Sequence, residues 1–224
     1  MPSYKKHILF SIILAIPFIQ DVFYLSLAVI GASIIDMDHH VKKNNLIIMA
    51  IFGVILSIAF YIFNLPFYIG FSLIAMSFIF YISNHRGFSH SIFGTLTLSI
   101  LLSFFVLSLY PLINKLNVDP KLSIILILII LSIIILNKKI LLIFLVLSTI
   151  GIILLPFTNI TPYFTFLAIL MGCISHIILD LFTPSGIRVL NPISRKKFKK
   201  GLGAFLFILW VFGVFIVYFK DIIV

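Results

Sequence analysis

Residues 122–136 read LSIILILIILSIIIL and contain no charged side chain, and residues 140–156 form a second run of the same kind. A membrane-spanning helix needs roughly 17–25 predominantly apolar residues, and these runs reach or approach that length. The whole chain has this character, since 62% of its 224 residues are hydrophobic and 10% are charged. Soluble domains average about 45–50% apolar residues and about 25% charged residues. The sequence therefore predicts an integral membrane protein.

Eight hydrophobic segments separated by short polar connections cover the chain: 8–35, 46–63, 66–83, 91–113, 122–136, 140–156, 162–182 and 203–219. Each is expected to be helical, because a helix satisfies its own backbone hydrogen bonds in lipid. We predict an all-α fold, a polytopic transmembrane helix bundle of seven or eight segments. It forms a single domain over residues 1–224, with a basic cytoplasmic connection at about residues 183–202.

The first segment is too long for one ordinary span. Its 28 residues would form a helix of about 42 Å, whereas the hydrocarbon core is about 30 Å thick. Pro17, Gln20 and Asp21 interrupt it, and proline removes a backbone donor and tends to break a helix. We expect a broken helix or hairpin that enters and leaves from one side. The alternative, a single tilted span, places His7 on the opposite side.

The Lys and Arg residues predict the orientation. If the connection after Ile35 is cytoplasmic, eleven basic residues face the cytoplasm, three face the opposite side, and two depend on the first segment. This asymmetry obeys the positive-inside rule, so we predict a multi-pass protein of the cell (inner) membrane. Five basic residues precede the last segment and are expected to contact lipid headgroups rather than nucleic acid: Arg195, Lys196, Lys197, Lys199 and Lys200.

The chain contains six acidic residues, all Asp, and six His. Three of the Asp and five of the His fall in three motifs on the predicted cytoplasmic face: DMDHH at 36–40, HRGFSHS at 85–91 and SHIILD at 175–180. An ionisable group that faces lipid costs several kcal/mol, so these side chains are expected to point into the bundle. The spacing of four residues places His176 and Asp180 on one helix face.

This clustering favours a metal site. Mixed Asp and His ligands suit zinc first, with manganese and iron as alternatives, and one or two ions are expected. The candidate ligands are Asp36, Asp38, His39, His85, His90, His176 and Asp180. Taken singly, each motif is also explained by a helix cap, an interfacial loop or a hydrogen-bonded pair. Arg86 either holds a phosphate or oxyanion or anchors the chain on the cytoplasmic side.

These motifs resemble the YdjM-like membrane proteins, a family described as LexA-binding, inner-membrane-associated metal-dependent hydrolases. The family has a Pro-Asp-Ile-Asp-His-like element, matched at residues 35–39 with Ile35 in place of Pro. Its His-Arg-Gly-x-Thr-His-Ser element is matched at 85–91 with Ser89 in place of Thr. Its Ser-His-x-x-x-Asp-x-x-Thr-Pro-x-Gly element is matched at 175–186. Nothing in these residues indicates binding of LexA.

The resemblance implies phosphoester hydrolysis, because the family is distantly similar to zinc-dependent phospholipases C. It also adds His7 as a ligand, since residues 6–11 resemble the family's His-containing start. In this hypothesis the metal acidifies a water molecule, Asp38 or Asp180 is the general base, and Arg86 stabilises phosphoryl charge. The expected substrate is a lipid or another membrane-associated phosphoester.

Two functions from other classes compete with this hypothesis. A transporter of protons or divalent cations also uses intramembrane His and Asp, but it is expected to carry such groups at several depths. A non-catalytic membrane adaptor would use the metal only as a structural element.

Overall fold

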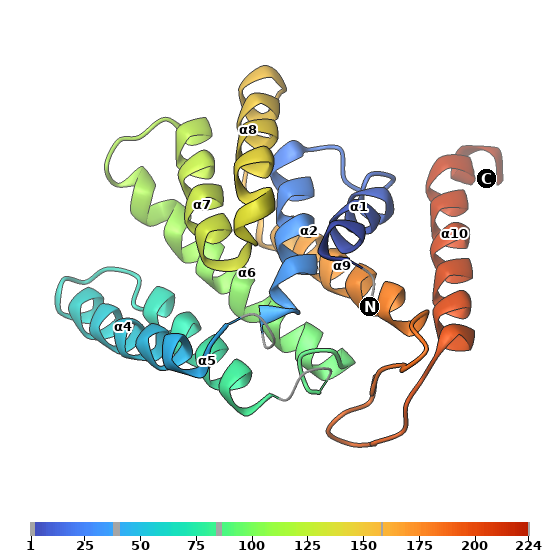
Figure 1. Cartoon of the computed structure of the whole chain (residues 1–224). Coiled ribbons are helices and arrows are strands. Elements are labelled where there is room, and N and C mark those ends of the chain that lie inside the picture. Colours follow the sequence, from blue (N-terminus) through green and yellow to red (C-terminus); the bar gives the residue numbers. More distant parts are fainter. Residues whose placement is uncertain (1–2, 38–40, 84–86, 158, 224) are drawn as a thin grey trace.

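The structure, a computed structural model, describes residues 3–37, 41–83, 87–157 and 159–223, and of residues 220–223 it describes the backbone alone. Within these residues the chain forms nine helices and no strand, which confirms the predicted all-α bundle (Figure 1). The helices are α1 (Tyr4–Ala15), α2 (Val22–Ile34), α4 (Lys43–Ile62), α5 (Tyr68–Ile82), α6 (Ile92–Asn114), α7 (Pro120–Ile135), α8 (Lys138–Leu154), α9 (Pro162–Leu181) and α10 (Lys200–Ile223).

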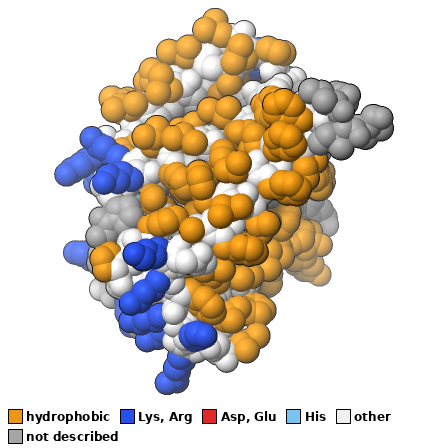
Figure 2. Space-filling model, turned by 90° about the vertical axis from the view of Figure 1, so that its right-hand side faces the viewer, with side chains coloured by type: hydrophobic (Ala, Val, Ile, Leu, Met, Phe, Trp, Pro, Cys, Tyr) orange, Lys and Arg blue, Asp and Glu red, His pale blue; other side chains and the backbone are white. Residues whose placement is uncertain are grey.

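Four of the helices, α4, α6, α9 and α10, are long and apolar enough to cross a membrane, and α2, α5 and α7 are shorter apolar helices. Much of the surface of α4 and α10 is hydrophobic and exposed, as expected of helices that face lipid. Figure 2 shows a face covered mainly by hydrophobic side chains, with Lys and Arg gathered along one edge. This distribution agrees with a bundle that sits in lipid and has a basic rim.

The first hydrophobic segment is broken, as the sequence predicts. Helix α1 ends at Ala15, two residues before Pro17. Helix α2 starts after Asp21, whose carboxylate accepts a hydrogen bond from the backbone N–H of Phe23 at 2.8 Å. The start of α1 and the end of α2 reach the same cluster of side chains, described below. The two helices therefore form the predicted hairpin.

Helix α9 is the centre of the arrangement, since α1, α2, α6 and α10 all pack against it. Its contact with α2 is very close. A Cβ atom at Gly172 would overlap the carbonyl of Ala28, and one at Gly31 would overlap the carbonyl of Ile169. Small residues allow such an approach between membrane helices. The close contact brings the last turns of α9 against the end of α2.

The connection after α9 folds back over the bundle. Ile187 and Phe198 exchange two backbone hydrogen bonds of 3.0 and 2.8 Å, and the backbone N–H of Ile92 donates to the carbonyl of Val189 at 2.9 Å. Ile187 and Val189 are buried. The five basic residues predicted to contact headgroups are exposed, and that contact stays a prediction: Arg195, Lys196, Lys197, Lys199 and Lys200.

Candidate metal centre

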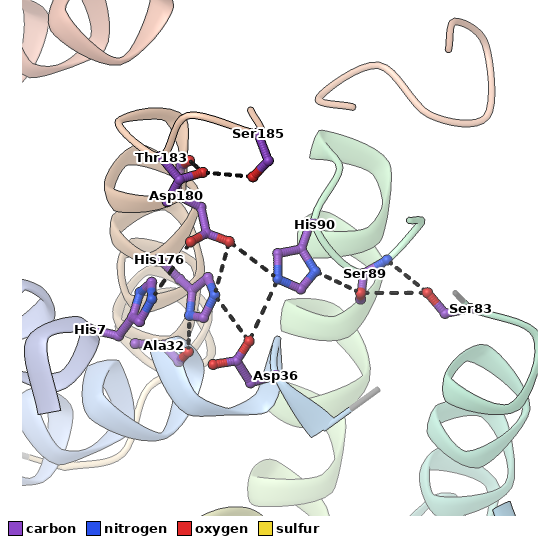
Figure 3. Close-up of polar contacts among 10 residues, drawn as sticks. All are labelled: His7, Ala32, Asp36, Ser83, Ser89, His90, His176, Asp180, Thr183 and Ser185. Carbon is purple, nitrogen blue, oxygen red and sulfur yellow. Dashed lines mark hydrogen bonds and ion pairs between the residues drawn. The ribbon is translucent and has the colours of Figure 1, made fainter. Parts of the chain in front are cut away.

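Five ionisable side chains from distant parts of the chain meet at one end of the bundle (Figure 3). They are His7 of α1, Asp36 after α2, His90 before α6, and His176 and Asp180 of α9. All are buried except for an edge of Asp36, whose side chain is 12% exposed. The structure thus gathers five of the eight predicted ligands. Asp38, His39, His85 and Arg86 lie outside the described residues, so their roles stay predictions.

Local structure explains how His90 is positioned. The Ser91 hydroxyl donates to the carbonyl of Phe88 at 2.7 Å and accepts from the backbone N–H of Gly94 at 3.0 Å. Ser91 is therefore the N-cap of α6, as Ser commonly is at helix starts. The cap fixes the turn that carries His90. On α9, by contrast, regular helical spacing alone places His176 and Asp180 on consecutive turns.

The ring nitrogens of His90 and His176 lie at ligand-like distances from the carboxylates of Asp36 and Asp180. His90 Nε2 lies 3.6 Å from Asp36 Oδ1 and 3.5 Å from Asp180 Oδ2. His176 Nε2 lies 3.5 and 3.8 Å from the same two oxygens. These distances exceed an N–H···O hydrogen bond of about 2.7–3.2 Å. Ligands about 2.1 Å from a tetrahedral ion stand about 3.4 Å apart. The residues present therefore fit a divalent metal ion.

His7 extends this set on the other side of Asp180. Its Nε2 lies 3.7 Å from Asp180 Oδ1, and its ring stacks on that of His176 with centroids 3.8 Å apart. Asp180 thus presents one oxygen to His7 and the other to His90 and His176. His7, His176 and Asp180 form a second group that could hold a metal ion, overlapping the group of Asp36, His90 and His176. The five residues could therefore hold one ion or two.

The imidazoles have outer partners that the sequence did not predict. His176 Nδ1 lies 2.7 Å from the carbonyl oxygen of Ala32, and His90 Nδ1 lies 3.0 Å from the hydroxyl of Ser89. The backbone N–H of Ser89 in turn donates to the Ser83 hydroxyl at 3.3 Å. Such partners orient a metal-binding imidazole, and a carbonyl partner, which only accepts, also fixes which nitrogen carries the proton. Ser89 lies inside a recognised motif, whereas no sequence signal points to Ala32 or Ser83.

The charge of Asp36 suits a ligand. Burial alone would raise the pKa of its carboxyl, but the neighbouring imidazoles of His90, His176 and His7 outweigh that effect and hold the pKa below its usual value. Asp36 is therefore a carboxylate at neutral pH, which is the form that binds metal.

Helix α9, which supplies His176 and Asp180, lies in the part of the chain that a family model matches. Residues 140–223 match the model of the YdjM inner membrane protein family. This match confirms the YdjM resemblance over most of α8 and all of α9 and α10. His7, Asp36 and His90 lie outside the YdjM match. No curated protein and no solved structure matches the chain.

Proposed function

We propose that the chain is a metal-dependent hydrolase embedded in the cell (inner) membrane, and that it cleaves a phosphoester of a lipid or another membrane-associated substrate at the cytoplasmic face. One observation carries the proposal. Buried His and Asp side chains from four separate segments converge with the spacing of metal ligands. Burying so many ionisable groups at the end of a membrane bundle is costly, and a bound cation offsets that cost.

The chain positions of basic residues support a cytoplasmic site. Lys5 and Lys6 precede His7, Lys42 and Lys43 follow the Asp36 motif, and Arg188 follows Asp180. The cluster thus lies at the basic end of the bundle, which the positive-inside rule assigns to the cytoplasm.

One basic residue on the opposite side has a structural reason to be there. Lys121 Nζ donates to the carbonyls of Ile153 and Leu155 at 3.0 and 3.1 Å, at the end of α8. A lysine at this place satisfies the last carbonyls of a helix. The position of Lys121 therefore has a structural cause. It counts less against the predicted orientation than a lysine without such a role would.

The side chains have separate tasks in the proposed reaction. Asp36, His90 and His176 would hold a divalent ion, which as a Lewis acid would acidify water and offset negative charge on a phosphoryl group. Asp180, with one oxygen toward His7, accepts a proton from the attacking water as the oxygen of that water bonds to phosphorus. The bond from phosphorus to the leaving oxygen then breaks, and Asp180 passes the proton to that oxygen. Asp38 as a further base and Arg86 as the group facing phosphoryl charge complete the proposal.

The transport alternative has less support. A carrier of protons or metal ions needs ionisable groups along a path between the two faces. Among the described residues, the buried Asp and His side chains are the five of this cluster. The hydrolase is therefore the better supported function.

The first experiment measures the metal content of the detergent-purified protein by mass spectrometry, for the wild type and His176→Ala. Ile174→Ala is the matched control, because Ile174 is on the same helix and 40% exposed. We expect stoichiometric zinc, manganese or iron in the wild type and the control, and loss of metal in His176→Ala. A chelator should lower the thermal midpoint of the two metal-bound proteins only, since a ligand stabilises the state that binds it.

The second step tests catalysis. Vesicles of phosphatidylglycerol and a chromogenic phosphodiester are incubated with the wild type, His90→Ala and Asp180→Ala, and release of product is followed. Both variants should be inactive. A metal-free wild type after reconstitution, or normal hydrolysis by either variant, would overturn the proposed function.

A further inference from the structure

A groove runs between α1 and α8. Both helices pack on α2, but they make no comparable contact with each other. Figure 1 shows α2 between them. Helix α2 is therefore the floor of the groove, and α1 and α8 are its two walls.

One part of this groove is an apolar cavity of about 250 Å³. Its lining comes from successive turns of the three helices and includes Ile8, Ile12, Leu25, Val29, Ile143 and Leu147. On α8, Ile143 is 61% and Leu147 66% exposed. These side chains offer a surface on which hydrocarbon packs without loss of hydrogen bonds.

The other part is a cavity of about 380 Å³ at the end nearest the metal centre, with a lining of mixed character. We call it the polar cavity because it contains the charged side chains of the groove. Tyr4, Ser33, Asn137, Lys138 and Lys139 contribute to its lining. Tyr4 lies one turn before Ile8 on α1, and Ser33 lies one turn after Val29 on α2. Lys139 lies one turn before Ile143 on α8. The two cavities therefore share these three helices at consecutive turns, with the cationic residues at one end, and the polar cavity also reaches Ile134 and Ile135 of α7.

The polar end borders the candidate metal centre. Tyr4 precedes His7 by three residues, and Met37, which also lines the polar cavity, directly follows Asp36. Asp36 is the most exposed of the five clustered side chains. The cavity that Lys138 and Lys139 line is thus also lined by near neighbours, in the chain, of two cluster residues.

The groove has a limited length, because α8 approaches its neighbours at both ends. At the polar end the backbone N–H of Asn137 donates to the Tyr4 hydroxyl at 3.3 Å. At the other end Gly151 lies against Val22, where an added Cβ would stand 2.9 Å from Val22 Cγ1. Between Asn137 and Gly151 the helix rises about 21 Å. This is the scale of one lipid molecule in one leaflet of a bilayer whose core is about 30 Å thick.

We infer that this groove binds one anionic phospholipid, with its phosphate at Lys138 and Lys139 and an acyl chain in the apolar cavity. The inference deepens the proposed function and rests on it in one respect, since it makes that lipid the substrate. Two observations select the occupant. Cationic side chains at the polar end complement a phosphate, and the apolar length below them complements a hydrocarbon chain.

Native mass spectrometry of the detergent-solubilised full chain tests the inference. Equal amounts of dioleoyl phosphatidylglycerol and dioleoyl phosphatidylcholine are added, and one retained phosphatidylglycerol is expected. Ile143→Trp fills the apolar cavity and should lower retention at least about tenfold. Leu142→Trp is its control, because Leu142 is 72% exposed on the same helix and does not line the cavity. Leu147→Trp is the second filling variant.

The headgroup end is tested in the same way. Replacing both Lys138 and Lys139 with Gln should lower retention of phosphatidylglycerol about 30-fold, since each cation near an anionic lipid contributes about 1 kcal/mol. The control replaces Lys5 and Lys6 with Gln, because these residues are exposed on α1 and do not line the polar cavity.

Metal content is measured on the same samples, which separates the two proposals. Wild-type lipid retention in the filling and lysine variants would overturn the groove and leave the hydrolase standing. A metal-free wild type that still retains phosphatidylglycerol would overturn the hydrolase and leave the lipid-binding groove standing. Equal retention of phosphatidylcholine would overturn the anionic headgroup, and a dimer lost in Ile143→Trp would show that a second copy fills the groove.

Discussion

The imidazole of His176 donates its Nδ1–H to the carbonyl oxygen of Ala32 across 2.7 Å. A carbonyl oxygen only accepts, so in the neutral imidazole this contact leaves the lone pair on Nε2, the nitrogen that faces Asp36 and Asp180. The protein thereby prepares His176 as a metal ligand through a main-chain group of another helix. Because Ala32 follows Gly31 and His176 lies one turn after Gly172, the close packing of α2 on α9 sets the geometry of the ligand.

The first prediction follows from that packing. In Gly172→Ala the added methyl would overlap the carbonyl of Ala28, so α2 and α9 must move apart. We expect a loss of about 1–3 kcal/mol of stability from overpacking. We also expect weaker metal binding, although no ligand is changed. Gly201→Ala is the control, because no atom lies within 4 Å of its added Cβ. The metal affinities of both variants are measured by titration. Equal affinities would contradict a link between the packing of α2 on α9 and metal binding.

The second prediction concerns Ser89, whose hydroxyl lies 3.0 Å from His90 Nδ1. Loss of an outer partner typically weakens metal binding about 10–100-fold, and Ser89→Ala is expected to fall in that range. Ser89→Thr keeps the hydroxyl, and Thr is the residue of the family pattern, so it should restore affinity. Ser103→Ala is the matched control. Ser103 is also buried, but it lies within α6 and donates its hydrogen bond to the carbonyl of Ser99. An affinity of Ser89→Ala equal to that of the control would exclude the positioning role.

Much of the fold was predictable because lipid allows few solutions. Long uncharged runs must be helices, and Pro17 with Asp21 indicated where the first one breaks. The structure ends α1 at Ala15 and begins α2 at Val22. The meeting of His7, Asp36, His90, His176 and Asp180 followed from placing three motifs on one face and from the resemblance that added His7. Ionisable side chains in a membrane protein have few stable positions besides a shared interior.

Other parts of the site were not predictable, for identifiable reasons. The Ala32 carbonyl has no side-chain signature, since every residue carries one. Ser83 contributes only because the turn before α6 returns to it. The groove depends on α1 and α8 both packing on α2, a tertiary relation that hydrophobic periodicity does not encode. Residues 188–200 are rich in basic side chains, yet the buried packing of Val189 beside them could not be recognised from charge.

The third prediction tests orientation. Cys173 is the only cysteine and is fully buried, so the wild type should not react with a membrane-impermeant maleimide. Lys196→Cys lies at the basic end and should be labelled only after the cells are lysed. Lys115→Cys follows α6 at its far end and should be labelled in intact cells. The reverse pattern would place the metal centre outside the cytoplasm.

The fourth prediction concerns the contact that ties α10 to the first hairpin. Trp210 Nε1–H donates to the carbonyl of Leu14 at 3.0 Å. In a continuous helix this carbonyl would accept from the N–H of Phe18, but that N–H bonds Ala15 instead, at 3.0 Å. The break in the first segment thus leaves a buried carbonyl that Trp210 satisfies, and an unsatisfied carbonyl in an apolar environment is costly.

Trp210→Phe should therefore destabilise the protein by about 1–3 kcal/mol and lower its thermal midpoint in detergent. Metal content should stay that of the wild type, because Trp210 contacts α1 at Leu14, two turns away from His7. Phe212→Leu is the control, since Phe212 is on the same helix and 60% exposed, and its midpoint should not change. If both variants unfold at the same temperature, the indole does not hold the hairpin, and the Leu14 carbonyl must be satisfied by another group.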